Sequence, residues 1–192
     1  MKIVISLLFS SFSLFSFAQD TSTKYYFKEV GWRIAIPSDF IPYDSAELSA
    51  ANQVGKDTVN DPLRSDTLFW RNLFIAVKKD SYAFSASIMP FNEQRGGDYQ
   101  KRIKLSNDKM ITLLRSKFPG AALSFRSSST NIDGVLFSKM NFETKMTDSK
   151  VLHFVELTKL YKGYAFSIQY SYMDELTRQQ IETALEESKF DK

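Results

Sequence analysis

His153, the only histidine of the chain, is the side chain best suited to acid–base chemistry near neutral pH. It stands in the stretch VLHFVEL, where Val151 and Val155 share its period-two face. A general base also needs a nucleophile to activate, and no G-x-S-x-G elbow or comparable signature accompanies it. We therefore expect His153 to pack half-buried within a sheet, and we predict no catalytic residues.

Metal binding through nitrogen or sulfur has few candidate ligands, because the chain holds one histidine and no cysteine. Oxygen ligands are more abundant, since the stretch KDTVNDPLRSD contains Asp57, Asn60, Asp61 and Asp66. Calcium prefers such oxygens, yet the spacing matches no EF-hand and the nearest glycine precedes the cluster. A loop that uses Asp and Asn as turn formers is the favoured interpretation, so no metal and no cofactor is predicted.

A basic face is expected on a helix predicted over residues 98–118. Its cationic residues are Lys101, Arg102, Lys104, Lys109 and Arg115, with Asp108 among them. Such a face would attract an anionic membrane, a glycan or an acidic protein surface. A charged face opposite an apolar one is also typical of any solvated helix, and this simpler interpretation is favoured.

Residues 41–66 form a long irregular connection between predicted strands, and long connections are often lids or binding loops. Beside the small residues Ser85, Ser87, Ser167 and Gln169, this segment could roof a shallow groove. Those small residues could equally serve only to let a helix pack closely, and both interpretations stay open. The candidate binding surface comprises Tyr43, Leu48, Val54, Val59, Lys101 and Arg115.

Period-two patterns predict the strands that must position these side chains. The clearest are YAFSIQYSY (164–172) and YAFSASIM (82–89), in which large apolar residues alternate with mostly small ones. Further strands are expected over 25–30, 32–36, 67–78, 121–130, 134–146 and 150–161. Short turns such as Asp133-Gly134 and Lys162-Gly163 imply an antiparallel meander.

Two long helices interrupt the strands. The first, over 98–118, lies between Gly96-Gly97 and Pro119-Gly120 and has an apolar stripe that should face the sheet: Tyr99, Ile103, Met110, Leu114 and Phe118. The second, over 174–188, opens at Asp174 and is expected to pack through Leu176, Ile181, Ala184 and Leu185. A shorter helix can cover 45–54, where Asp44 and Glu47 have the spacing of a capping box.

This order of elements indicates the α+β class, with a mostly antiparallel β-sheet flanked by helices. The opening strand GWRIAIPSDF, the mid-chain helix, the last strand in GYAFSIQYSYMDE and the closing SKF (188–190) together resemble the Mog1/PsbP-like family of α/β/α sandwiches. The resemblance covers roughly 25–190. It implies a small accessory or binding domain, as exported bacterial members look to be. It does not imply one partner, since partners in the family range from a small GTPase to a photosynthetic complex.

The N-terminus predicts export. Met1-Lys2 is followed by an apolar run over 3–17, and Ser16-Phe17-Ala18 has small residues where a signal peptidase requires them, so cleavage is expected after Ala18. The predicted organisation is a signal peptide over 1–18, a disordered mature N-terminus over 19–24 and a single domain over 25–190. The expected location is periplasmic or secreted, with no further membrane span.

The net charge of +3 predicts no nucleic-acid partner. The leading hypothesis is an exported, soluble, non-catalytic accessory domain that acts by protein–protein contact in the cell envelope. The alternative is a carrier of a small, partly apolar ligand in a groove beneath residues 41–66.

Overall fold

The computed structural model describes residues 22–47, 72–80, 82–147 and 150–191. In chain order the elements are β1 (Ser22–Phe27), β2 (Trp32–Pro37), β3 (Ile41–Pro42), β4 (Asn72–Lys79), β5 (Tyr82–Pro90), α2 (Glu93–Gly96), α3 (Tyr99–Lys117), β6 (Leu123–Ile132), β7 (Val135–Thr147), β8 (Lys150–Tyr161), β9 (Tyr164–Tyr172), α4 (Glu175–Glu187) and β10 (Lys189–Phe190). The predicted α+β class is confirmed.

Antiparallel pairing joins the strands into two sheets. The larger has the order β3-β4-β5-β9-β8-β7-β6, and the smaller has the order β1-β2-β10. Both residues of Asp133-Gly134 and of Lys162-Gly163 have positive φ, the conformation that two-residue type I′ hairpins require, so β6–β7 and β8–β9 are tight hairpins. β9 pairs with β5 as well as with β8, which places the last long strand in the middle of the larger sheet.

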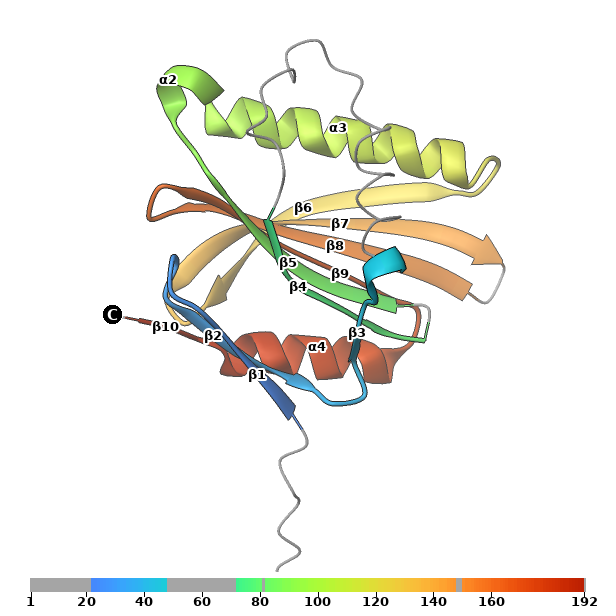
Figure 1. Ribbon diagram of the computed structural model, residues 1–192. Coiled ribbons are helices and arrows are strands. Elements are labelled where there is room, and N and C mark those ends of the chain that lie inside the picture. Colours follow the sequence, from blue (N-terminus) through green and yellow to red (C-terminus); the bar gives the residue numbers. More distant parts are fainter. Residues whose placement is uncertain (1–21, 48–71, 81, 148–149, 192) are drawn as a thin grey trace, which may run out of the picture.

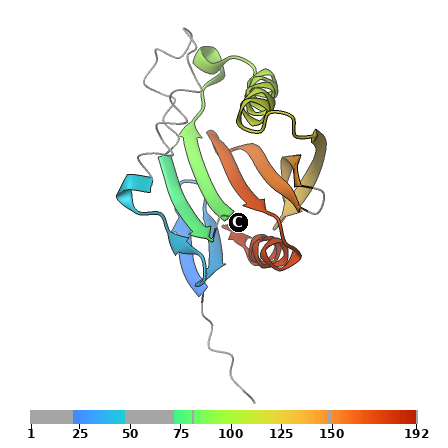
Figure 2. The same ribbon diagram turned by 90° about the vertical axis from the view of Figure 1, so that its right-hand side faces the viewer.

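The elements form layers around the larger sheet. α4 and the smaller sheet cover one face of it, and α3 lies over the opposite face (Figure 1 and Figure 2). The core lies on the α4 side, where burial of aromatic side chains supplies the main driving force for folding. Trp32 is completely buried there. Its ring lies 5.2 Å from that of Phe166, and its Nε1 donates a 3.0 Å hydrogen bond to Ser188 Oγ.

α4 follows its prediction except at its first apolar residue. Asp174 caps the helix, because its Oδ1 accepts a 2.7 Å hydrogen bond from Thr177 N. The buried positions are Thr177, Ile181, Ala184 and Leu185, a spacing of one helical face. The prediction that Leu176 packs on the sheet is wrong: its side chain is 63% exposed, since Thr177 takes the place one turn before Ile181.

The N-terminal prediction also needs a correction. Residues 22–24, expected to be disordered, belong to β1, which pairs with β2 from Ser22 opposite Pro37 to Phe27 opposite Trp32. The pairing of β1 with β2 therefore begins at Ser22, before Tyr25. Polar side chains at the start of the strand are compatible with pairing, because Thr23 and Lys24 are exposed there.

The capping box at residues 44–47 is confirmed. Asp44 N donates to Glu47 Oε2 over 3.0 Å, and Glu47 N donates to Asp44 Oδ1 over 2.8 Å, at the start of a helical turn over 45–47. The strand β3 and the short helix α2 were not predicted. No helix in the described part of the chain is both long and apolar enough to cross a membrane.

Candidate functional site

The two faces of the larger sheet differ in character. The face toward α4 is mainly apolar, whereas the face toward α3 carries two rows of mainly polar residues that run directly across five strands. One row is Ser87, Ser167, Thr158, Ser138 and Ser129, and the other is Ser85, Gln169, Glu156, Met140 and Ser127. Four of these polar residues are nonetheless buried: Ser87, Glu156, Thr158 and Ser167. Buried polar groups need hydrogen-bond partners, so this face of the sheet must contain hydrogen bonds between side chains as well as apolar packing.

The helix α3 lies over this polar face without burying any of its own residues. Every member of the predicted apolar stripe is half-buried: Tyr99, Ile103, Met110, Leu114 and Phe118. Ile103 faces the sheet across a groove, as predicted. Asp98 caps the helix, since its Oδ1 accepts hydrogen bonds from Gln100 N and Lys101 N. α3 is therefore a well-capped helix that packs loosely on the domain.

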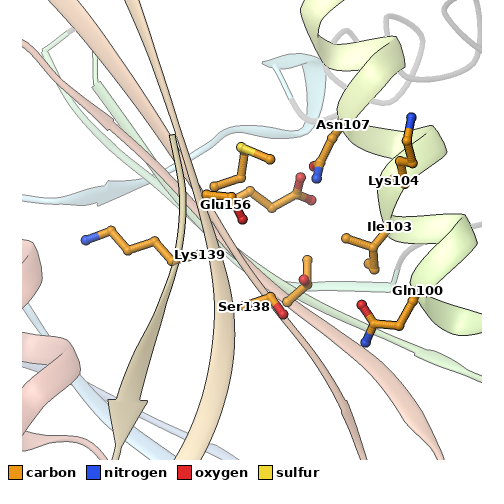
Figure 3. Close-up of a pocket in the computed structure, with 10 residues that line it drawn as sticks. Gln100, Ile103, Lys104, Asn107, Ser138, Lys139 and Glu156 are labelled. Carbon is orange, nitrogen blue, oxygen red and sulfur yellow. The ribbon is translucent and has the colours of Figure 1, made fainter. Parts of the chain in front are cut away.

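The groove between α3 and the sheet has a volume of about 270 Å³. The helix lines it with Gln100, Ile103, Lys104 and Asn107, and the sheet lines it with Ser127, Ser138, Lys139, Met140, Glu156 and Thr158 (Figure 3). The side chain of Lys139 points away from the groove, toward Glu182 on α4 at 3.7 Å. The remaining lining offers hydrogen-bonding groups beside the two apolar side chains of Ile103 and Met140.

Glu156 lies at the floor of the groove and is only 2% exposed. Its Oε1 accepts hydrogen bonds from Gln169 Nε2 at 2.8 Å and from Ser167 Oγ at 3.3 Å. Neutral donors on β9 thus help to hold a buried carboxylate in place. Such a group can form hydrogen bonds with a bound molecule at the floor of the groove.

Sequence analysis named Ile103 on the apolar stripe and Lys104 on the basic face, and it placed Ser167 and Gln169 beside a possible groove, but it did not identify Glu156 or the other groove residues. The sequence did contain one signal: Glu156 is an acidic residue within the apolar strand stretch VLHFVEL, on the face opposite to His153. The hydrogen-bond partners of Glu156 come from β9, and the roof of the groove comes from α3. The pairing of β8 with β9 cannot be predicted from a local sequence pattern.

The predicted surface residues Lys101 and Arg115 lie on the same outer face of α3, about four turns apart. Both are exposed, as are the other residues of this outer face: Lys104, Leu105, Asp108 and Thr112. Lys104 Nζ pairs with Asp108 Oδ2 at 2.8 Å, and the side chain of Leu105 is 50% exposed. The outer face of α3 therefore presents net positive charge around an exposed apolar residue.

Tyr43 lies elsewhere, beside β4 near the opposite edge of the larger sheet. Its N donates to Ala76 O at 3.1 Å, Lys78 Nζ lies 5.7 Å from its ring centre, and burial raises the pKa of its hydroxyl. It is half-buried and does not join the α3 surface. The other predicted contact residues (Leu48, Val54 and Val59), the Asp/Asn loop at 57–66 and most of the groove predicted beneath 41–66 lie outside the described residues.

His153 packs within the sheet as predicted. Its ring stacks on that of Tyr172 at 4.6 Å and 9°, and its side chain is 25% exposed. Its Nδ1 is buried and lies 3.8 Å from Glu143 Oε1, beyond hydrogen-bonding distance. Alternation along β8 places His153 on the face opposite to Glu156, so the two do not share a site. Within the described ranges, no group of three His, Asp or Glu side chains could hold a metal ion.

Comparison with known proteins identifies the fold. No family model matches the chain, and no curated protein matches it. Among solved structures, the chain is similar to the solution structure of cyanobacterial PsbP (CyanoP) from Synechocystis sp. PCC 6803, with a TM-score of 0.54 at 9% sequence identity. The similarity covers 92% of this chain and 96% of that one. The chain has a PsbP-like fold.

Proposed function

We propose that the protein is an exported, soluble, non-catalytic accessory domain that acts by protein–protein contact in the cell envelope. The observation that carries the proposal is the outer face of α3. This helix has 19 residues and none of them is buried, so it contributes little to the core of its own domain. A helix that is well capped but loosely packed is available to a partner.

The composition of this outer face suits a protein surface. Lys101, Lys104 and Arg115 give it positive charge, and Leu105 adds an apolar contact among them. Protein interfaces combine an apolar centre with a polar rim, and complementary charge speeds the encounter. The partner surface is therefore expected to be acidic with an apolar residue that covers Leu105.

A non-catalytic role is supported by the surroundings of His153. Its ring is stacked on Tyr172, and its face of the sheet is turned away from the groove. Export is supported by the sequence of the first 18 residues, which has the pattern of a signal peptide.

Native mass spectrometry of the protein purified from its own cells tests the proposal. We expect a co-purifying protein, and we expect Lys101→Glu with Arg115→Glu to reduce its recovery about tenfold or more, as reversal of two interface charges should. Lys28→Glu, an exposed site on the opposite side of the domain, is the control. Unchanged recovery from the double variant, or the absence of any protein partner, would contradict the proposal.

The groove favours a second candidate function, the carriage of a small molecule. About 270 Å³ is room for a small ligand, and Ile103 and Met140 beside Glu156 and Asn107 fit a partly apolar one with a hydrogen-bond donor. The same mass spectrum distinguishes the two functions. A bound small molecule that Glu156→Leu displaces, without any protein partner, would support the carrier.

A further inference from the structure

We infer that β6 is an open docking edge, to which an extended acidic segment of a partner protein adds as an eighth strand of the larger sheet. The inference rests on the proposed function, because it specifies how a protein partner binds. β6 is the last strand of the sheet and pairs only with β7 within the described residues. An edge strand exposes one row of backbone donors and acceptors, which is a template for a further strand.

The exposed backbone groups belong to the odd-numbered residues of β6. Lys145 N donates to Ala122 O, and Ile132 and Val135 flank the two-residue turn, so the even-numbered residues bond to β7. The backbone groups of Leu123, Phe125, Ser127, Ser129 and Asn131 therefore point outward. The side chains of 124–129 are all exposed, so no described element covers this stretch.

β6 lacks the features that normally protect an edge. It runs for 10 residues in continuous register with β7, without a bulge and without proline, and its single charged residue is Arg126. The opposite edge of the sheet is protected, since β3 has only two residues and ends in Pro42. A long, regular and nearly uncharged edge is expected to be covered by a partner in the functional state.

The side chains around the edge indicate what that partner looks like. Phe125 is 53% exposed although it lies beside the fully buried Phe142 in register, so an apolar residue of the added strand can complete this aromatic row. Arg126 is exposed and has no ion pair among the described residues. On the face opposite to Arg126, Lys104 lines the groove that reaches Ser127, and Lys101 lies one helical turn before Lys104.

Positive charge thus lies on both faces of the edge. Side chains of an added strand alternate between the two faces, so acidic residues at successive positions would meet Arg126 on one face and the lysines of α3 on the other. A second copy of this chain fits less well, because pairing of two β6 strands would bring the cations of two copies to one seam. The charges therefore favour an acidic segment of a different protein.

The test uses a synthetic ten-residue peptide in which pairs of adjacent glutamates alternate with single valine or threonine residues, so that glutamates reach both faces of the added strand. We expect it to slow amide hydrogen exchange at Leu123, Phe125, Ser127 and Ser129, the outward-facing positions, with little change at even-numbered positions already bonded to β7. Ser127→Pro removes one outward N–H, and we expect about tenfold weaker binding, the equivalent of roughly one hydrogen bond. Ser127→Ala keeps the N–H and should bind like the unchanged protein.

A second, independent part of the test changes the charges of the protein and of the peptide. Arg126→Glu should weaken binding of the acidic peptide, and a peptide with lysine in place of glutamate should not protect β6. Peptide binding that is equal for Ser127→Pro and Ser127→Ala would overturn the inference, as would protection elsewhere on the protein. A dimer in sedimentation that Ser127→Pro dissociates would identify a second copy as the occupant and would also overturn it.

Failure of this inference can be separated from failure of the proposed function. If the Ser127→Pro protein, folded as judged by circular dichroism, still co-purifies with its native partner, the edge is not the docking site and the contact function stands. If no protein partner co-purifies with the unchanged chain, the proposed function fails, whatever the peptide does.

Discussion

Removal of the Ser188 hydroxyl should destabilise the protein far more than an ordinary serine substitution. Ser188 Oγ accepts the hydrogen bond from the buried Trp32 Nε1 at 3.0 Å and itself donates to Leu185 O at 2.7 Å. Ser188→Ala therefore breaks two hydrogen bonds and leaves the buried indole N–H without an acceptor. An unsatisfied buried donor costs about 1–3 kcal/mol, so we expect a loss of about 2 kcal/mol.

The part of this loss that belongs to the Trp32–Ser188 contact can be isolated with a double-mutant cycle. Trp32→Phe removes the donor while it keeps an aromatic ring against Phe166 and Phe190. In that background, Ser188→Ala removes only the bond to Leu185 O, and we expect a loss of about 0.5–1 kcal/mol. The coupling energy is then about 1 kcal/mol.

Urea unfolding followed by circular dichroism measures all four free energies of unfolding. Thermal unfolding gives a second reading, since about 2 kcal/mol corresponds to a shift of roughly 4–8 °C for a domain of this size. Equal losses for Ser188→Ala in the two backgrounds would refute the argument that the indole hydrogen bond joins β2 to the end of α4.

Four further predictions concern single features. His153→Ala should reduce the free energy of unfolding by about 1–2 kcal/mol, by loss of its stacking on Tyr172, while partner binding stays unchanged in the native mass spectrum. The hydrogen bond from Thr177 N is the largest influence that lowers the pKa of Asp174. The ionised Asp174 side chain therefore stabilises the protein above about pH 4, and this stabilisation is lost as the pH falls through the folded-state pKa. Asp174→Ala should therefore cost about 1 kcal/mol at pH 7 and progressively less in urea titrations below pH 4. Intact mass of the protein from its own cells should show cleavage after Ala18, and retention of residues 1–18 would exclude the predicted site. Replacement of residues 45–62 by a short Gly/Ser linker should leave a folded domain by circular dichroism and weaken partner or ligand binding, whereas global unfolding would assign the segment to the core.

Local patterns predicted the elements well because each element carries its own signal. Asp174 marks the start of α4, and Ile181 and Leu185 mark its buried face. The alternation of large apolar and mostly small residues predicted the bounds of β5 and β9 to within one residue. Leu176 was misassigned because hydrophobicity was counted without checking its angular position on the helix.

The arrangement in space could not be predicted from the same patterns. Glu156 becomes part of a site only because β8 pairs with β9 and α3 crosses above, and both depend on contacts between residues far apart in the sequence. The position of β6 at the edge is likewise fixed by β9 inserting between β5 and β8. The serines of β6 look like an ordinary polar stretch until the pairing order shows that one side of it is open.

The central position of β9 also governs how the chain reaches its native state. Among the described strands only β10 follows β9 in the chain, yet in the larger sheet the strands β3 to β5 and the strands β6 to β8 meet only through β9. Until residues 164–172 have been synthesised, each group of strands has an open edge where β9 will pair, and neither can close the core. Assembly must therefore be a late event dominated by contacts distant in sequence, the class of topology that folds slowly. We therefore expect the chain to lack its closed core until synthesis is almost complete.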